Sequence, residues 1–139
     1  MNIKIFIDTN IFLNAVLDRD NGISREIFYF LESKDIKVIL NDISIINIHY
    51  FLTKSKTVSK EDIRKHIKQL INTNIIVPAS EMILNSAIDS DFDDFEDSVQ
   101  YFCAKELNVD LIISDDKKGF LLSDIRVFTS KEFYERYII

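Results

Sequence analysis

Segments typical of buried strands alternate with segments of helical periodicity along this chain, and this alternation constrains the fold more than any other feature. Short runs rich in Ile, Val, Leu and Phe predict strands at residues 3–7, 37–40, 75–77, 110–114 and 126–128. Apolar residues at helical spacing predict helices at residues 11–17, 24–31, 43–52, 59–71, 80–87 and 94–107, and a last helix that Ser130 caps. We therefore expect an α/β fold with a central parallel sheet of about four or five strands, flanked by helices on both faces.

The composition agrees with one domain built from long regular elements. The chain has 139 residues, and 47% of them are hydrophobic, which provides for a core and excludes general disorder. It contains two Gly and one Pro, so long elements joined by short polar turns are favoured over the many tight hairpins of a β-sandwich. Since no repeat or low-complexity linker divides the chain, we expect residues 1–139 to form a single domain.

The sequence carries no pattern of a secreted or membrane protein. Cys103 is the only cysteine, and its place on the apolar side of a predicted helix favours a buried small hydrophobe over a nucleophile. No apolar run approaches the roughly 18 residues of a membrane-spanning helix. The first residues are typical of a strand and not of a signal peptide. We therefore expect a cytoplasmic protein without membrane contact.

Aspartates stand where predicted strands end or a predicted helix begins. Asp8 ends the first strand, and Asp116 lies two residues past the strand that ends at Ser114. Asp94 and Asp97 open a late helix, where their spacing places them on one face. Functional groups of parallel sheets gather at the carboxyl ends of the strands, so we expect these carboxylates at one edge. Their mutual repulsion calls for a cation, and ligands that are all oxygen favour Mg²⁺ or Mn²⁺ over zinc.

Helix capping is the alternative explanation for the acids near the late helix. Asp93 and Glu96 have the spacing of a capping box, and the helix macrodipole favours acids in the first turn. Residues 89–97 nevertheless contain six acids and no base, which is more than capping requires. For Asp8, the alternative is that it only begins a turn. Thr9 and Asn10 could hydrogen-bond its oxygens or cap the following helix.

Motifs in three separate segments resemble, in order and spacing, those of the PIN domain family. They are Phe6-Ile7-Asp8-Thr9-Asn10-Ile11-Phe12-Leu13, then Asp94-Phe95-Glu96-Asp97 with Gln100-Tyr101 and Ala104, and finally Leu111-Ile112-Ile113-Ser114-Asp115-Asp116 with Phe120. Residues 127–133 also resemble the closing strand and helix of the family. The resemblance covers essentially the whole chain and is closest to the VapC-like toxins of toxin–antitoxin pairs, in the subgroup with a D-F-E-D sequence.

This resemblance implies a ribonuclease that uses one or two Mg²⁺ or Mn²⁺ ions to activate a water for phosphodiester hydrolysis. Asp8 matches the first acid of the family, Asp97 the acid at the start of the long helix, and Asp116 the acid after the late strand. Asp94 matches the additional acid of the D-F-E-D subgroup. These four aspartates would bind the metal and act in catalysis. Residues that would orient them or contact the substrate are Thr9, Asn10, Asn47 and Ser114.

Asn47 departs from the family pattern, because many PIN nucleases carry a Glu at the matching position in the helix after the second strand. An amide oxygen can ligate a metal or orient a water but carries no charge, so the departure bears on the number and affinity of metal ions. The D-F-E-D subgroup often has Asn there, and we expect activity to be retained.

Two functions from other classes stay open. One is a PIN-fold module that binds RNA or protein and has lost activity, with Asn47 as its first sign; the retention of the other acids argues against it. The other is a phosphotransferase or phosphatase that resembles the haloacid dehalogenases. That class needs a second Asp two residues after the first, where this chain has Asn10.

Other polar and aromatic residues are assigned to the core or the surface. His49 and His66 lie too far apart in sequence to suggest a zinc pair. The aromatic residues within 28–30 and 50–51 favour core or partner packing over base stacking. The most basic stretch, which is either a solvated face or a path for an RNA backbone, comprises Lys54, Lys56, Lys60, Arg64, Lys65 and Lys68.

The net charge of −6, from 17 basic and 23 acidic residues, is at first sight unfavourable for a nucleic-acid partner. The six acids within residues 89–97 account for the whole excess, and bound metal would neutralise part of them. The charge is therefore compatible with an RNA substrate. The resemblance also implies a cognate antitoxin protein and a homodimer.

Overall fold

Five parallel strands form the central sheet in the computed structural model, which describes residues 2–139. In their order across the sheet they are β3 (Ile75–Val77), β2 (Lys37–Asn41), β1 (Lys4–Ile7), β4 (Leu111–Ile113) and β5 (Arg126–Phe128). The predicted α/β fold is confirmed, and every strand lies within one residue of its expected bounds.

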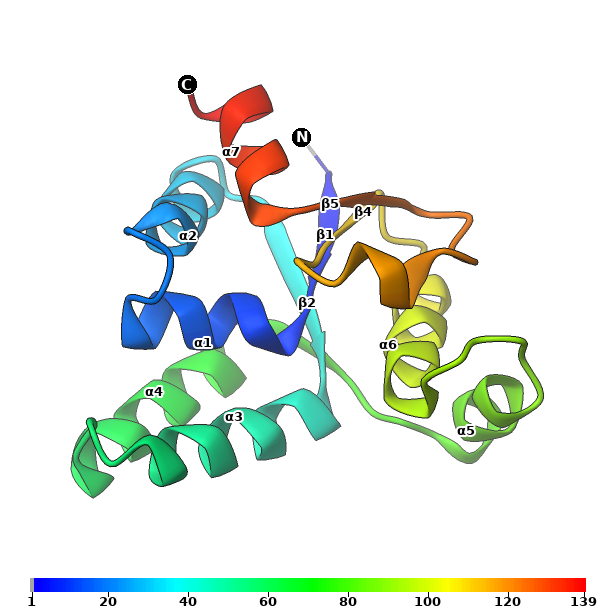
Figure 1. The fold of residues 1–139 in the computed structure, drawn as a ribbon, viewed down its shortest axis with the longest axis horizontal. Helices are drawn as coiled ribbons and strands as arrows, with labels where there is room; N and C mark the ends of the chain where they lie inside the picture. The colour runs from blue at the N-terminus through cyan, green and yellow to red at the C-terminus, as the bar shows by residue number, and fades with distance from the viewer. Residues whose placement is uncertain (1) are drawn as a thin grey trace.

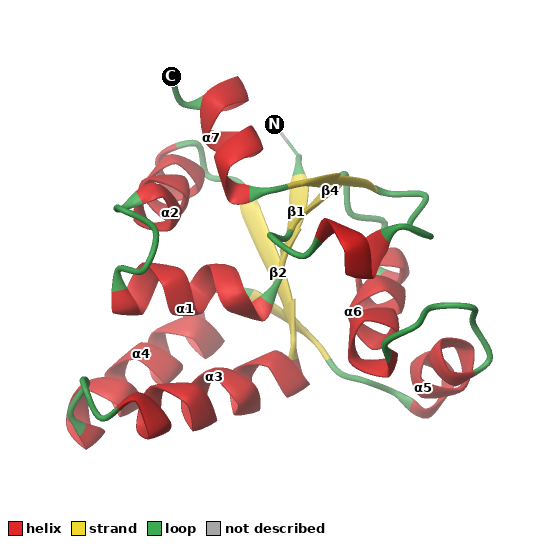
Figure 2. Ribbon diagram, viewed as in Figure 1, coloured by secondary structure: helices red, strands yellow, loops and turns green. Residues whose placement is uncertain are grey.

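Helices cover both faces of this sheet, as predicted. Figure 1 and Figure 2 show α1 to α4 with α7 on one side, and α5 with α6 on the other. The helices are α1 (Thr9–Leu17), α2 (Ile23–Ser33), α3 (Asp42–Ser55), α4 (Lys60–Thr73), α5 (Glu81–Ile88), α6 (Phe95–Glu106) and α7 (Ser130–Tyr137), with one 3-10 turn, η1 (Lys117–Phe120).

The central strand β1 is buried on both faces. Ile5 and Ile7 pack into the core shared with α1, α2, α3, α4 and α7, whereas Phe6 packs into the core shared with α5 and α6. None of the three is more than 1% exposed. Side chains alternate between the faces of a strand, so a strand covered on both sides must be apolar throughout. This explains why the apolar run of β1 is unbroken up to Asp8.

The strand order reverses at the boundary between β1 and β4. The chain builds β2 and β3 on one side of β1 and then crosses to build β4 and β5 on the other. Ligand sites of parallel sheets lie outside the carboxyl ends of the strands at such a reversal. Asp8 N donates to Ile113 O at 3.0 Å, which joins the two strand ends at this point.

Two expected helix caps are wrong. Thr129, and not Ser130, caps α7 and forms a capping box. Asp94, and not Asp93, caps α6. Phe95, in the first turn of α6, is 47% exposed. The 3-10 turn η1 was not expected. In each capping error the correct residue is an adjacent one with the same capping chemistry.

Cys103 is fully buried, as predicted. Burial raises the pKa of its thiol to about 12, so the reactive thiolate is not populated near neutral pH. Over residues 2–139, the structure contains no helix long and apolar enough to cross a membrane.

Asp115 ties the end of β4 to two helices. Its Oδ1 accepts 2.8 Å hydrogen bonds from the N–H and from Oγ of Ser130 at the start of α7. Its Oδ2 accepts a longer bond, 3.4 Å, from Asn14 Nδ2 on α1. Since Ser130 is only 5% exposed, loss of this carboxylate would leave buried donors without a partner.

We expect Asp115→Ala to lower the free energy of unfolding by about 1–2 kcal/mol, because unsatisfied buried donors are costly. Urea denaturation followed by circular dichroism measures this change. The exposed Asp91→Ala is the matched control and should shift stability by less than about 0.5 kcal/mol. Equal stability of the two variants would contradict the structural role given to Asp115.

Candidate functional site

Asp8 follows β1 directly and is 4% exposed. Its Oδ2 accepts a 2.7 Å hydrogen bond from Ser114 Oγ at the end of β4. The side chain of Gln100 and the backbone N–H of Thr9 also donate to this carboxylate. Burial raises the pKa of Asp8, and these three hydrogen bonds oppose the rise. Asp8 is the N-cap residue of α1, but its side chain makes no capping hydrogen bond.

Ser114 connects Asp8 to Asp116. While its Oγ donates to Asp8, it accepts a 3.1 Å bond from the backbone N–H of Asp116. Asp116 Oδ1 in turn accepts a 3.1 Å bond from Gly119 N and caps η1. Ser114 is fully buried, so a single shielded hydroxyl fixes the positions of two acids from different strand ends.

Gly119 leaves the space in which Asp97 of α6 approaches Asp116. A Cβ at this glycine would lie 2.6 Å from Asp116 Oδ2 and would also overlap Asp97 Oδ2. Real Cβ atoms essentially never come this close to another heavy atom. The two carboxylate oxygens therefore border the same small volume, which a larger residue would fill.

The pKa of Asp97 reflects the convergence of the acids. It rises from 3.8 to about 7, first through burial and then through the negative charges of Asp94, Asp8, Asp116 and Glu96. Each of these groups therefore lies within electrostatic range of Asp97. The charges of the other three aspartates that the sequence singled out, and of Glu96, thus act on Asp97, although no three of these side chains in the described part of the chain are close enough to enclose an ion.

Asp94 takes the capping role that the sequence left as one of two alternatives, and it lies near other acids. Its Oδ1 accepts a 2.9 Å hydrogen bond from Asp97 N and so caps α6. Its charge also raises the pKa of Asp97 and of Glu96, which shows that it lies beside the other acids. Capping of α6 thus accounts for the presence of one acid, Asp94, within residues 89–97. It does not account for the other five acids of this segment.

The other predicted site residues take different positions. Thr9 Oγ1 donates to Ser44 Oγ of α3 at 2.9 Å, so its hydroxyl braces α1 against α3 and only its backbone N–H contacts Asp8. Asn10 lies exposed in the first turn of α1. Asn47 Nδ2 donates to Glu96 Oε1 at 2.8 Å, a contact that joins α3 to α6.

Gln100 and Glu96 were not predicted as site residues. Gln100 is 3% exposed, and its Oε1 has no hydrogen-bond partner within the described part of the chain. Both residues lie on α6 close to Asp97, and Gln100 follows Asp97 by three residues, so helical spacing could have indicated a shared face. The contact between Asn47 and Glu96 joins residues far apart in sequence, and no local pattern indicates it.

The donor set fits a hard divalent cation. It consists of carboxylate, hydroxyl and amide oxygens, which Mg²⁺ and Mn²⁺ prefer, and two of the carboxylates, Asp97 and Asp116, lie against Gly119. The buried, unpartnered Gln100 Oε1 supplies a further acceptor beside Asp8. Within residues 2–139, no group of three or more His, Cys, Asp or Glu side chains is already close enough to enclose an ion. Binding an ion would therefore draw the repelling carboxylates closer together.

Residues assigned to the core or the surface behave mostly as expected. His49 is exposed on α3, and His66 is half-buried on α4. Phe28 stacks on Phe12 with ring centroids 4.9 Å apart, which is core packing. Tyr50 is 48% exposed and lies against Lys54, whose Nζ is 5.5 Å from the ring centroid. All six residues of the basic stretch between 54 and 68 are exposed.

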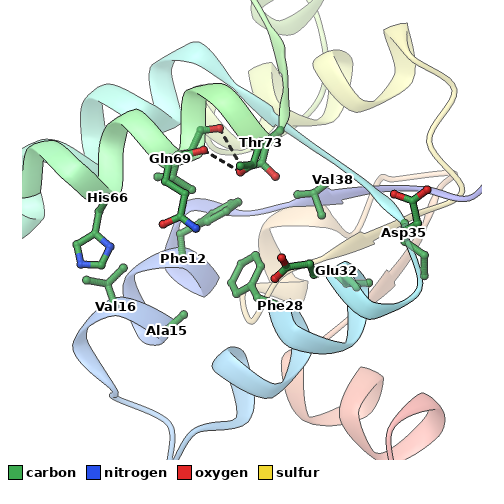
Figure 3. A pocket seen from close by; sticks show the side chains of 14 residues that line it. Phe12, Ala15, Val16, Phe28, Glu32, Asp35, Val38, His66, Gln69 and Thr73 are labelled. Atoms are coloured by element: carbon green, nitrogen blue, oxygen red, sulfur yellow. Dashed lines mark hydrogen bonds between the residues drawn. The ribbon is translucent and has the colours of Figure 1, made fainter.

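A cavity of about 330 Å³ lies away from the acids. Figure 3 shows it between α1, α2 and α4, with Phe12, Phe28 and His66 around it. Glu32 and Asp35 add two carboxylates to an otherwise largely apolar lining. None of the converging aspartates lines this cavity, so it is separate from the acidic site.

Comparison with known proteins agrees with this geometry. A sequence model of the PIN domain matches residues 4–118. Ribonuclease VapC1 of Aquifex aeolicus is 30% identical over 141 residues, which cover 96% of this chain and 95% of that protein.

Solved structures share the fold at low sequence identity. VapBC2 from Rickettsia felis, bound to a DNA fragment from its promoter, contains a chain with a TM-score of 0.69 and 15% identity, over 91% of this chain and 98% of that one. A toxin–antitoxin complex from Klebsiella pneumoniae contains one with a TM-score of 0.67 and 17% identity, over 91% of this chain and 97% of that one. The family match over residues 4–118, together with the relative at 30% identity, shows that this chain belongs to the PIN domain family.

Proposed function

We propose that this protein is a divalent-metal-dependent endoribonuclease and the toxin of a toxin–antitoxin pair. The observation that carries the proposal is the proximity of Asp8, Asp97 and Asp116 at the reversal point of the sheet, where Asp97 and Asp116 both lie against Gly119. The name of the Aquifex aeolicus relative, a ribonuclease, supports the same activity.

In this proposal Asp8, Asp97 and Asp116 hold one or two Mg²⁺ or Mn²⁺ ions, with Asp94 beside them. A bound ion of this kind lowers the pKa of a water ligand and neutralises the charge that builds on the phosphate oxygens. The protein's own contribution is to orient its acids at the strand ends, where the scissile phosphate would enter.

Neutral groups around the acids set their orientation. Ser114 fixes Asp8 and the backbone of Asp116 with one hydroxyl. Gln100 donates to Asp8 from α6. Such hydrogen bonds to a carboxylate favour its ionised form and lock its rotamer, which is the function that residues around a metal site commonly serve. Asn10, exposed beside Asp8, is left free to contact the substrate.

We assign RNA as the substrate and a cognate antitoxin as the protein partner. Exposed Lys and Arg side chains between residues 54 and 68, on α3 and α4, provide positive charge for a phosphate backbone. The Rickettsia felis and Klebsiella pneumoniae neighbours were solved as VapBC2 and as a toxin–antitoxin complex, which supports a partner of that kind. A homodimer in the cytoplasm is the state that we propose for the unbound protein.

One alternative from the sequence remains. The PIN family match removes the resemblance to haloacid dehalogenases from consideration, because that class has a different fold. A PIN-fold binding module without activity is still distinct from a nuclease, and only a cleavage experiment separates the two.

Wild-type protein should cleave RNA in the presence of Mg²⁺ or Mn²⁺ and lose this cleavage in EDTA. Asp97→Asn should lower the rate by about 100-fold or more, because it removes a charged ligand without changing the shape of the side chain. Cleavage of a fluorescent RNA measures both effects. Asp91→Asn is the control, since it removes one charge from the same acidic segment. Metal-independent cleavage, or an Asp97→Asn rate equal to that of the wild type, would refute the proposal.

Gly119→Ala should lower the cleavage rate while the fold is retained. The added methyl group would collide with the carboxylates of Asp97 and Asp116 and displace at least one of them. We expect a loss of about tenfold or more, by analogy with changes in the groups that orient metal ligands. Gly22→Ala adds backbone strain at a positive φ of 82° but no collision, so it tests whether a glycine replacement without a clash has this effect. Unchanged activity of Gly119→Ala would contradict the close approach of Asp97 and Asp116 at Gly119.

Stability in the absence of metal should depend on the charge of Asp97. Its pKa in the folded state, about 7, exceeds the ordinary value of 3.8, so the folded protein binds this proton more tightly and stability falls as pH rises through that window. At a pH of about 7.5, Asp97→Asn should be more stable than wild type by about 1 kcal/mol, a value reduced for the half-exposed position.

The comparison at low pH and with metal completes this test. Near pH 4 the difference should shrink, because wild-type Asp97 is then protonated. Mn²⁺ should raise the melting temperature of wild type more than that of Asp97→Asn. Thermal unfolding in both conditions measures these shifts, and a wild type more stable than Asp97→Asn in EDTA at high pH would contradict the raised pKa.

A further inference from the structure

The 3-10 turn η1 packs against α6, and Asp124 in the loop after this turn is bonded to the same helix. Asp124 Oδ1 accepts a 2.6 Å hydrogen bond from Tyr101 Oη, and its Oδ2 accepts a 2.9 Å bond from Lys105 Nζ. The ammonium of Lys105 also lies 5.6 Å from the ring centroid of Tyr101. A phenol and an ammonium of α6 therefore hold both oxygens of one carboxylate in the loop.

The two donors to Asp124 continue the face of α6 that carries Asp97. Tyr101 follows Asp97 by four residues, and Lys105 follows Tyr101 by four, so the three side chains form one stripe along the helix. At the start of this stripe, Asp97 lies against Gly119 of η1. At its other end, the stripe binds Asp124. The turn and its loop are therefore in contact with α6 at both ends of the stripe.

The loop between η1 and Asp124 is short and is held by its own hydrogen bonds. Phe120 is 2% exposed and packs into the same core as Tyr101. Ser123 N donates to Phe120 O at 3.0 Å, Ser123 Oγ donates to Ile125 O at 2.7 Å, and Ile125 N donates to Ser123 Oγ at 3.0 Å. Because the loop is stiffened in this way, a constraint applied at Asp124 also acts on η1.

The electrostatic forces at the two ends of the stripe are opposite in sign. The carboxylates of Asp97 and Asp116, when both are ionised, favour separation of η1 from α6. The ammonium of Lys105 attracts Asp124 and opposes this separation. That ion pair is half-exposed and by itself weak, but the hydroxyl bond comes from Tyr101, which is only 5% exposed and so cannot follow a loop that moves away.

We infer that Asp124 is a positioning residue of the acidic site, because its bonds to Tyr101 and Lys105 hold η1 against α6. Asp116 caps η1, so a shift of this turn away from the helix would carry its carboxylate away from Asp97. The inference rests on the proposed function, since a fixed distance between these acids serves the binding of a divalent cation. In this role Asp124 contacts neither the cation nor the RNA.

Titration calorimetry with Mn²⁺ and amide hydrogen exchange measure the two parts of this role. Asp124→Ala removes both bonds to α6, and we expect it to weaken Mn²⁺ binding about tenfold, as does the loss of other groups that orient metal ligands. In EDTA, the backbone amides of Gly119 and Ser123 should exchange about fivefold faster than in wild type. At a fixed low Mn²⁺ concentration kcat should fall about tenfold, while the KM for RNA should change less than about twofold.

Glu135→Ala is the matched control, because it removes an exposed carboxylate that pairs with a lysine, Lys131, on another helix. It should leave the Mn²⁺ affinity and both exchange rates within about twofold of the wild-type values. Equal far-UV circular dichroism spectra at the assay temperature would show that both variants are folded.

Tyr101→Phe separates the hydroxyl bond from the packing of the ring. We expect this variant to weaken Mn²⁺ binding about threefold, because the ion pair with Lys105 is retained. Added to Asp124→Ala, it should cause no further loss, since the bond that it removes is already absent. Losses that add would show that the two residues act independently, and would overturn their bond as the cause.

The outcomes separate this inference from the proposed function. If wild type binds Mn²⁺ and cleaves RNA while Asp124→Ala matches the control in affinity and exchange, the positioning role is overturned and the proposed function stands. Faster exchange without a loss of affinity would also overturn it, because the loop would then move without effect on the site. If wild type binds no Mn²⁺, the proposed function fails, and this inference fails with it.

Discussion

Repulsion among carboxylates at the carboxyl edge of the sheet is the constraint on which the rest of the site depends. Asp8 is 4% exposed, so both burial and the neighbouring acid Asp116 oppose its ionisation. Ser114, Gln100 and the backbone N–H of Thr9 act in the opposite direction by donating hydrogen bonds. The site is therefore organised by its neutral donors as much as by its acids. Each donor comes from the end of a strand or from a helix beside it.

The architecture determines which acids are forced together. Reversal of the strand order at β1 and β4 puts the ends of two strands side by side, and α6 begins next to them. The positive end of the α6 dipole partly offsets the charges of Asp94 and Asp97. Gly119 in η1 then leaves the volume in which Asp97 and Asp116 meet. Fold and site are thus parts of one arrangement, since shifting any of these elements would separate the acids.

The sequence predicts well whatever follows from local periodicity. Apolar runs gave each strand within one residue, and the ends of those runs identified Asp8 and Asp116. Periodicity within a segment does not predict which side chains of different helices or strands come into contact. The pair of Asn47 and Glu96 depends on how α3 and α6 face each other, which no spacing within either helix specifies. Sequence also misleads between adjacent residues of like chemistry, as with Thr129, which caps α7 in place of the predicted Ser130.

The distribution of charge explains why a net charge of −6 coexists with a proposed RNA substrate. The excess lies in residues 89–97, and within this segment Glu96 and Asp97 are affected by the charge of Asp8. With a pKa of about 7, Asp97 retains a proton over a wide pH range, which relieves part of the repulsion. A proton and a divalent cation are therefore alternative ways of neutralising the same group. Because they compete, the proposed metal affinity must fall as the pH drops below about 7.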